Sequence, residues 1–517
     1  MKQLVILFLA ISFQSVSGQK YDSTFNGNGF VTGATLYEGL NMIEEPTDVI
    51  YESTTGKIVM LNQFNWEGAT LHRFNSDGSY DIDFGTDGIQ EYYKAEEDEF
   101  INVFETEDGY MLTGRTSPEY GVYSPILEEI QADGNVNTAF GIDGINAVYS
   151  IDSLIVRASY KGASGRYILI GNDVDWYVGG GIMVFNADGS YDAGFGYQTL
   201  NISGELASIS FECVLELPDG RILVGGNADI GFDVYQAFTV CYLANGIIDE
   251  SFGENGFLYP EPEIVHGNSS TQKMTIDADG NIYAAGFITT LPGTDYMVIK
   301  FNDSGEIDAG FGSSGYVYLD GEGGLELKKL DVNSANQLYV LGVDHPEADA
   351  TLRTTIYKLL ETGEPDPAFT NGVPGQFLIE VPGTDSDNDI EGRNMIIQAD
   401  GKLVIIGNTD GLSANDDFWI GRITTNETPV DVINENEMPK NISIFPNPAS
   451  NYLDITSDVN IESATIFSLD GKQIKSIFDV NDLQRVDVSD LEPGCYVLEV
   501  KLSENEISSL SFIKESL

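Results

Sequence analysis

Short apolar runs separated by clusters of Gly, Asn and Asp occupy most of the chain, and no long apolar helical stripe follows the first twenty residues. In the middle of the chain, residues 214–217 (Val-Leu-Glu-Leu) form one strand-like run, residues 219–220 are Asp-Gly, and residues 221–226 (Arg-Ile-Leu-Val-Gly-Gly) form the next. Asp-Gly between apolar strands is a strong hairpin signal, because both central residues of the turn take positive φ. The same dipeptide returns at 108–109, 279–280 and 400–401. The pattern predicts an all-β chain of short antiparallel strands.

A longer signature repeats at a nearly constant period. It consists of an acidic residue or Asn, one or two small residues, Phe, and then usually Gly. Its phenylalanines are Phe25, Phe84, Phe140, Phe195, Phe252, Phe311 and Phe369, spaced 55 to 59 residues apart. Each copy holds about four strand-like runs, which is the content of one β-propeller blade. Each repeated Phe is interpreted as a core residue.

The two ends of the repeat region complement each other. Only one strand, near residues 30–36, follows the first signature before an inner strand begins, and no outer strand follows residues 418–423. If residues 30–36 complete the last blade, the ring closes and leaves no exposed sheet edge. We therefore expect a seven-bladed β-propeller over residues 20–425, followed by a small C-terminal β-sandwich.

These signatures resemble the delta-60 repeat family of secreted bacterial proteins, which is taken to form propellers. The resemblance covers roughly residues 20–425 and weakens at the fourth and seventh copies. The family has no established catalytic residues, so the resemblance implies none here.

The C-terminal region reads differently from the repeats. Residues 426–439 are polar and are interpreted as a linker, and residues 440–517 alternate apolar and polar positions as in a small sandwich. This last segment resembles the C-terminal sorting domain of the type IX secretion system of Bacteroidetes. The matching residues are Phe445, Pro446, Asn447, Pro448, Asp470, Gly471, Lys472, Gly494, Tyr496 and Lys514. The resemblance implies contact with the secretion machinery, passage through the periplasm, and removal of the domain as the cargo is attached to the cell surface or released.

The N-terminus and the charge agree with export. Lys2 precedes an apolar run at residues 4–13 that is too short to span a bilayer, so residues 1–18 are expected to be a cleaved signal peptide. No second apolar segment of membrane length follows, and no transmembrane segment is expected. The chain has 25 Lys and Arg against 82 Asp and Glu, a net charge of -57. Such a surface repels phosphate backbones and disfavours nucleic acid as a partner.

Candidate metal and catalytic residues are few. Asp385, Asp387 and Asp389 have the spacing of a calcium loop, but Ile390 and Ile396 stand where an EF-hand needs Gly and Glu. A looser calcium site and a plain acidic loop both fit, and no other cofactor is expected. Asp277, Asp279 and Asn281 also look like a metal loop, but only the hairpin turn is shared with other repeats. That segment is interpreted as hairpin geometry.

The sequence favours binding or structure over catalysis. Sialidase-like propellers use an arginine cluster and a characteristic Asp box; Arg157 and Arg393 lie near inner strands, but the box is absent. The favoured function is a secreted or cell-surface binding or structural protein, whose ligand would be a glycan or a protein. The alternative is a secreted glycan-active hydrolase or lyase. The aromatic segments 175–177 and 417–419 suit either sugar stacking or strand packing.

Three cysteines are too few for a disulfide scaffold. Cys213 and Cys241 are expected in one blade with a strand between them, which places them beyond disulfide reach. Both are predicted to be free, buried thiols.

Overall fold

The structure is a computed structural model that describes two ranges of the chain, residues 20–425 and 442–514. Short segments within these ranges are not described: 34–35, 38–39, 42–43, 65–67, 94–97, 120–121, 149–153, 174–178, 201–207, 230, 232–233, 261–267, 290–293, 320–323, 346–350, 386–387, 411–416, 446–448, 450, 458–460, 469–472, 478–484, 490, 492–493 and 503–506. The chain divides into two compact units, residues 1–430 and 431–517. The expected signal peptide and linker lie outside the described residues.

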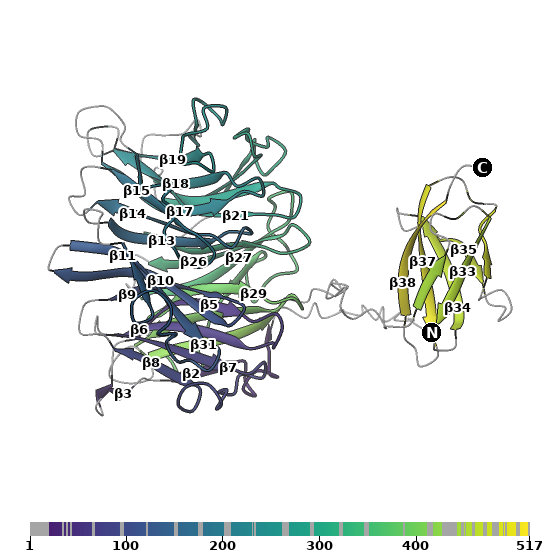
Figure 1. Cartoon of the computed structure of the whole chain (residues 1–517), viewed down its shortest axis with the longest axis horizontal. Helices are drawn as coiled ribbons and strands as arrows, with labels where there is room; N and C mark the ends of the chain where they lie inside the picture. Colours follow the sequence, from purple (N-terminus) through teal and green to yellow (C-terminus); the bar gives the residue numbers. More distant parts are fainter. Residues whose placement is uncertain are drawn as a thin grey trace, which may run out of the picture. The chain divides into compact units, whose positions relative to one another are not determined.

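The larger unit is built from antiparallel sheets that follow one another along the chain (Figure 1). The described residues form six four-stranded sheets and one five-stranded sheet. The first three contain β5 (Glu44–Tyr51), β6 (Ile58–Phe64), β7 (Gly68–Phe74) and β8 (Ile89–Tyr93); β9 (Glu99–Glu105), β10 (Gly109–Glu119), β11 (Val122–Gln131) and β12 (Ile145–Ala147); and β13 (Leu154–Lys161), β14 (Tyr167–Asp173), β15 (Gly180–Phe185) and β16 (Gln198–Leu200). The next three contain β17 (Ile209–Glu216), β18 (Ile222–Asp229), β19 (Tyr235–Tyr242) and β20 (Phe257–Leu258); β21 (Ser269–Ile276), β22 (Ile282–Thr289), β23 (Thr294–Phe301) and β24 (Tyr316–Leu319); and β25 (Gly324–Val332), β26 (Leu338–His345), β27 (Arg353–Leu359) and β28 (Gln376–Leu378). The last joins β29 (Ile390–Ile397), β30 (Leu403–Thr409) and β31 (Asp417–Thr424) to β1 (Lys20–Tyr21) and β2 (Phe30–Gly33), while β3 (Leu36–Tyr37) and β4 (Leu40–Asn41) form a separate small pair.

Sheets and sequence repeats are offset by one strand. The strand that directly follows each signature pairs with the strand before that signature, as β20 pairs with β19. Each sheet therefore takes its first three strands from before a signature and its outermost strand from directly after that signature. The same offset makes β2 the partner of β31, which is the closure expected for residues 30–36.

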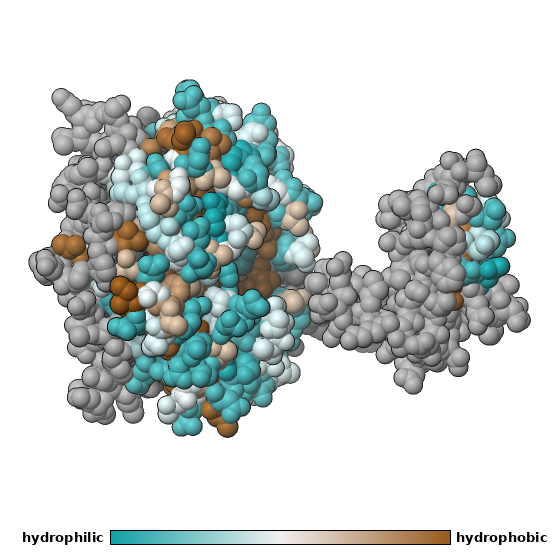
Figure 2. Space-filling view, in the orientation of Figure 1, coloured by the Kyte–Doolittle hydropathy of each residue, from teal (hydrophilic) through white to brown (hydrophobic). Residues whose placement is uncertain are grey.

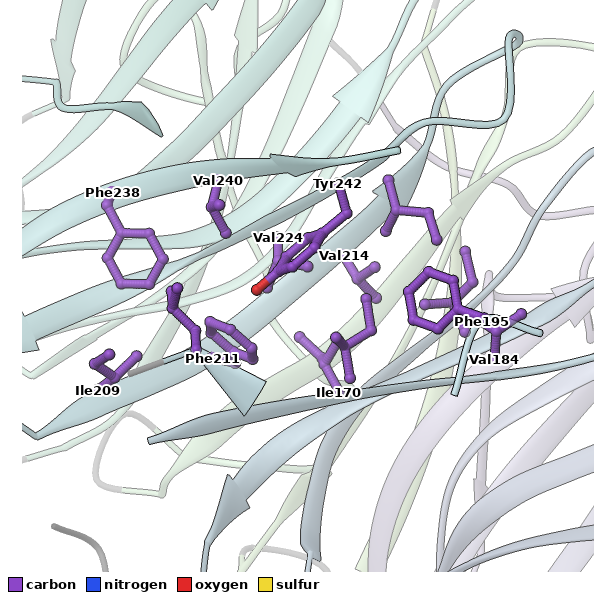
Figure 3. Close-up of a cluster of buried hydrophobic side chains, with 14 of the residues drawn as sticks. Ile170, Val184, Phe195, Ile209, Phe211, Val214, Val224, Phe238, Val240 and Tyr242 are labelled. Atoms are coloured by element: carbon purple, nitrogen blue, oxygen red, sulfur yellow. The ribbon is translucent and has the colours of Figure 1, made fainter. Parts of the chain in front are cut away.

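The sheets form a closed ring around their first strands. Each of β5, β9, β13, β17, β21, β25 and β29 contacts the next, and β29 contacts β5, so both lie side by side in Figure 1. The core lies between neighbouring sheets, in clusters of buried apolar side chains. Figure 3 shows one of them, where Ile170 and Val184 of the third sheet meet Val214, Val224 and Tyr242 of the fourth. Burial between sheets holds the ring together by the hydrophobic effect.

Every signature Phe enters one of these clusters. Phe84 joins the cluster between the first and second sheets, and Phe252 the one between the fourth and fifth. The remaining five occupy the other sheet interfaces, and all seven are at most 2 % exposed except the half-buried Phe140. The interpretation of the repeated Phe as a core residue is confirmed.

The rest of the signature builds a corner that links one sheet to the next. Gly85 N donates to Asp133 O in the following sheet at 3.0 Å, and Gly253 N donates to Ser304 O at 2.8 Å. Asp87 has φ 54° and its neighbour Gly88 has φ 94°, which explains the Asn-Gly or Asp-Gly ending of the signature.

The acidic residue at the start of the signature is held by a buried cation. Arg73 Nε donates to Asp81 Oδ2 at 2.7 Å, and Arg422 Nε donates to Asp22 Oδ2 at 2.8 Å. Because Asp22 precedes β2 and Arg422 lies on β31, the second pair closes the ring between the two ends of the unit. His72, fully buried on β7, stacks edge-on against Phe418 at the same closure.

The smaller unit has two sheets. One contains β32 (Ile442–Phe445), β33 (Tyr452–Ser457) and β36 (Arg485–Asp487), and the other contains β34 (Ile461–Ser468), β35 (Gln473–Ile477), β37 (Gly494–Leu502) and β38 (Ile507–Lys514). A separate cluster around Leu453, Ile466 and Leu498 joins the two sheets. Two packed antiparallel sheets with one core are a β-sandwich.

The described cysteines agree with the sequence prediction. Cys213 lies on β17 and Cys241 on β19, with β18 between them. Both are buried and free.

Candidate functional site

Each innermost strand of the ring carries the same backbone irregularity. Its pairing with the second strand slips by one residue near its middle, so one residue of the innermost strand has no partner. Such a β-bulge bends the strand and re-aims a side chain. The bulged residues are Thr47, Ile101, Arg157, Glu212, Gln272, Lys328 and Arg393.

The bulges lie along the wall of a central channel. A cavity of about 580 Å³ is lined by all seven innermost strands and includes six of the seven bulged residues. The repeat thus supplies one backbone frame, while the side chain at each bulge differs in charge and size. We call this cavity the channel site.

The channel site is richer in cations than the rest of the protein. Its lining includes five of the chain's 25 Lys and Arg but only four of its 82 Asp and Glu. The basic residues are Arg157, Lys273, Lys328, Lys329 and Arg393, and the acidic ones are Glu45, Glu212, Glu326 and Asp331. The sequence pointed to Arg157 and Arg393 only.

Two of these cations are neutralised by glutamates at one end of the strands. Lys328 Nζ lies 2.6 Å from Glu326 Oε1 and 2.8 Å from Glu391 Oε1. Arg393 Nη2 lies 2.9 Å from Glu391 Oε2, and its Nε donates to Asn408 Oδ1 at 2.9 Å. On β25 and β29, these two cations and two glutamates thus form one ion-paired cluster.

Lys273 and Lys329 occupy the positions directly after the bulge on adjacent strands, β21 and β25. Within the described part of the chain, neither has a hydrogen bond or an ion pair. Burial lowers the pKa of Lys273; Cys213 and Glu212 oppose this shift, and the nearby charges of Lys329 and Lys328 add to it. Like charges are therefore held together in the channel wall.

Asp48 sits at the equivalent position on β5 and ties three sheets together. Its Oδ2 accepts from Val103 N at 2.9 Å and from Asn102 Nδ2 at 3.1 Å, and its Oδ1 accepts from Asn394 Nδ2 at 2.8 Å. Burial raises the pKa of Asp48. The carboxylate is committed to N–H donors of the second and last sheets.

Cys213 lines the same cavity on β17. Its Sγ lies 3.7 Å from Thr271 O, and burial raises the pKa of the thiol to about 12. A thiol with so high a pKa stays protonated at neutral pH and is a poor nucleophile.

The structure describes the surroundings of some of the residues singled out as metal ligands. Asp389 Oδ1 accepts from Leu352 N at 2.7 Å, Asp385 is exposed, and Asp387 lies outside the described residues. The calcium site remains a prediction. Asp277 Oδ1 accepts from Asp279 N and Asn281 N at 3.0 and 2.9 Å, which is hairpin geometry as interpreted.

Of the two aromatic segments considered for sugar stacking, the structure describes one. Phe418 and Trp419 are buried in β31, and Trp419 Nε1 donates to Asn408 O at 3.1 Å. Strand packing accounts for them. Residues 175–177 lie outside the described part of the chain.

The sorting-motif residues that are described lie on the strands of the smaller unit. Phe445 ends β32, and Gly494 on β37 is the register partner of Lys514 on β38. Lys514 is buried and Tyr496 is half-buried against the core of the sandwich. The Pro446–Pro448 and Asp470–Lys472 segments lie outside the described residues.

Comparison with known proteins matches both units. Residues 443–514 match the family described as "Secretion system C-terminal sorting domain", and residues 217–252 match a β-propeller domain of unknown function, DUF5122. The protein is a β-propeller with a type IX sorting domain. The sorting domain directs this propeller protein through the type IX system to the outer cell surface or the medium, and it implies contact with the secretion machinery.

No curated protein sequence matches the chain. Among solved structures, the polysaccharide lyase Uly1 superposes with a TM-score of 0.46 at 12 % identity, over 74 % of this chain and 90 % of that one. A PL25 ulvan lyase bound to -[GlcA(1-4)Rha3S]- gives 0.45 at 10 % identity, over 72 % and 90 %. A Dyadobacter fermentans protein of unknown function gives 0.39 at 11 % identity, over 77 % and 100 %. Scores below 0.5 do not bear on what this propeller binds.

On the face shown in Figure 2 the described residues of the larger unit are largely hydrophilic, with scattered hydrophobic spots. No helix in the described part of the chain is long and apolar enough to cross a membrane.

Proposed function

We propose that residues 20–425 are a complete seven-bladed propeller that works outside the cell as a binding protein, with its ligand held in the channel site. Residues 1–18 direct the chain into the periplasm. Residues 426–439 tether the propeller to a sorting domain over residues 440–517. Within that domain, residues Phe445–Pro448, Asp470–Lys472, Gly494, Tyr496 and Lys514 form the motif set that the machinery recognises.

One observation supports the channel as the binding element. The bulge is repeated in all seven innermost strands, whereas its side chains range from apolar to acidic to basic. A backbone device retained in each repeat with variable side chains is what a binding site on a repeated scaffold needs. A purely structural ring would use the same filler residue at each bulge.

The channel also has a suitable size. Its volume of about 580 Å³ falls within the range of small-molecule sites, roughly 300 to 1,000 Å³. Ala158 and Ser159 supply small side chains on β13, so one part of the wall leaves room for a ligand.

The test fills the channel. The chain without its signal peptide is screened against neutral and acidic oligosaccharides, and bound members are measured again with Ala158→Trp. Ala158 lines the channel and also packs against the buried cluster between the third and fourth sheets, so binding is compared only after thermal melting has shown that the variant is folded. Ile82→Trp is the matched control, because Ile82 is 72 % exposed and lies on a signature corner. We expect Ala158→Trp to abolish binding and Ile82→Trp to leave it unchanged.

Two results would overturn the proposal. Binding that survives Ala158→Trp would place the ligand elsewhere. Shortening of a bound oligosaccharide during the assay would identify a glycan-active hydrolase or lyase instead.

A further inference from the structure

The channel site concentrates positive charge in a protein whose net charge is -57. Charged groups removed from water are normally paired, because desolvation of a lone charge is costly. Lys328 and Arg393 follow this rule through Glu326 and Glu391. Lys273 and Lys329, which are half-buried and line the cavity, have no such partner among the described residues.

Nearby acidic groups are already committed to other donors. Asp48 accepts from three N–H groups of neighbouring sheets and from Val49 N. Asp331 accepts from Val332 N at 2.9 Å, and burial raises its pKa. Glu212 accepts from the Ser210 hydroxyl. Each of these acids stabilises a backbone or a side chain of its own wall.

The two lysines lie at equivalent positions on neighbouring strands and repel each other. Lys329 is attracted by the buried carboxylates of Asp48 and Asp331, and Lys273 by Glu212. None of these acids makes an ion pair with either lysine among the described residues, so both ammonium groups keep the capacity to bind an anion. A bound anion suits this arrangement, because one negative group between the two ammonium groups would be attracted by both and would offset part of their repulsion.

Resting on the proposed function, we propose that Lys273 and Lys329 are the anion-binding residues of the channel site and take the carboxylate or sulfate group of an acidic ligand. The same chemistry is offered by a free small acid and by an acidic sugar unit of a glycan. The cavity volume accommodates either one.

The experiment measures binding of sodium sulfate, sodium glucuronate, an acidic oligosaccharide and neutral glucose by calorimetry, at constant ionic strength, to the chain without its signal peptide. We expect the anions but not glucose to bind. Lys273→Met and Lys329→Met should each weaken anion binding at least about tenfold. Tighter binding of the oligosaccharide than of glucuronate identifies a glycan; equal binding identifies a free acid.

Two further variants separate a binding role from a structural one. Lys402→Met is the matched control, because Lys402 lies outside the channel and pairs with Asp400 at 2.7 Å; it should leave anion binding unchanged. Glu212→Gln removes a negative charge from the channel wall and should leave anion binding equal or tighter. Without ligand, Lys273→Met should melt at the same temperature as the parent or higher, because a repulsion has been removed.

The outcomes separate this inference from the proposed function. If neutral oligosaccharides bind in a manner that Ala158→Trp abolishes, but no anion binds at about 10 mM, the channel is a binding site and the anion assignment is wrong. If anions bind equally to Lys273→Met, Lys329→Met and the parent, the assignment is also wrong. Lower thermal stability of ligand-free Lys273→Met would show that Lys273 is structural.

Discussion

The corner and the channel wall of each repeat use their residues in opposite ways. At the corner, Phe, the acidic residue and Gly recur and make the same contacts, as Phe84 and Phe252 do at their sheet interfaces. At the channel wall, only the backbone slip recurs, and the bulged side chain changes from Thr47 to Arg157 to Glu212. The corners therefore add a recurring buried contact at the sheet interfaces, whereas the side chains at the bulges vary from sheet to sheet.

The largest expected effect comes from removing a corner. Phe84→Ala should lower the free energy of unfolding of the propeller by about 3 to 5 kcal/mol, because it leaves a cavity between two sheets. Urea denaturation followed by tryptophan fluorescence measures it. Phe140→Ala is the matched variant and should cost less, because Phe140 is only half-buried. Equal losses at both positions would contradict the view that burial at the corner sets stability.

Ring closure should be the next most sensitive feature. Arg422→Met removes the buried guanidinium from Asp22, leaves only Lys402 at 3.5 Å as its cation, and should cost about 3 kcal/mol. Adding Asp22→Leu removes the poorly paired carboxylate and should recover part of that loss. A double mutant no more stable than Arg422→Met alone would show that the pair is not what matters at the closure.

His72 should make the closure sensitive to mild acid. Burial lowers the pKa of His72 from its ordinary 6.5 to about 3, so the unfolded chain binds a proton that the folded chain rejects. Stability from this group is complete above about pH 6.5 and falls by roughly 1.4 kcal/mol per pH unit below it, until the folded pKa is reached. His72→Gln should flatten this slope, measured as urea midpoints at about pH 7.5, 6 and 5. An unchanged slope would contradict a neutral buried His72.

The corner carboxylates affect stability at lower pH than His72 does. Salt bridges and hydrogen bonds at the corners hold the pKa of Asp22 and Asp81 below the ordinary value of 3.8, despite the opposing effect of burial. Their contribution is present above that value and is lost as the pH falls through the lowered pKa. Acid sensitivity near pH 6 therefore reports His72 and not the corners.

The smallest expected effect on stability is at a bulge. Arg157 is exposed in the channel wall, so Arg157→Gln should change the free energy of unfolding by no more than about 0.5 kcal/mol. The same denaturation assay measures it. A loss comparable to that of Phe84→Ala would mean that the bulges carry stability as the corners do.

The contrast between corner and channel also explains which features of the propeller could be predicted from the sequence. The signature predicted the ring, the burial of Phe25 and its equivalents, and closure by residues 30–36, because those contacts depend on residue identity. The bulge depends on strand register, which no single residue signals. From the sequence, Arg157 and Arg393 were identified as cations near the inner strands, but Lys273, Lys328 and Lys329 were not.

Aligning the repeats on their inner hairpin turns predicts the positions of the channel lysines. Four of the bulged residues lie seven positions before the Asp of the inner Asp-Gly turn: Ile101, Glu212, Gln272 and Arg393. Counting back from that turn in every repeat places Lys328 at a bulge and Lys273 and Lys329 directly after one. The absence of a partner for Lys273 and Lys329 still required side-chain geometry.

Closure of the ring by β2 and β31 also sets an order of events during biogenesis. The two strands made first, β1 and β2, have no partner until residues 417–424 have been made. At roughly 5 to 20 residues per second, that interval is about 20 to 80 seconds, during which both strands must wait unpaired. The ring can therefore close only after nearly the whole propeller has been made, and the sorting domain follows the closing strand in the chain.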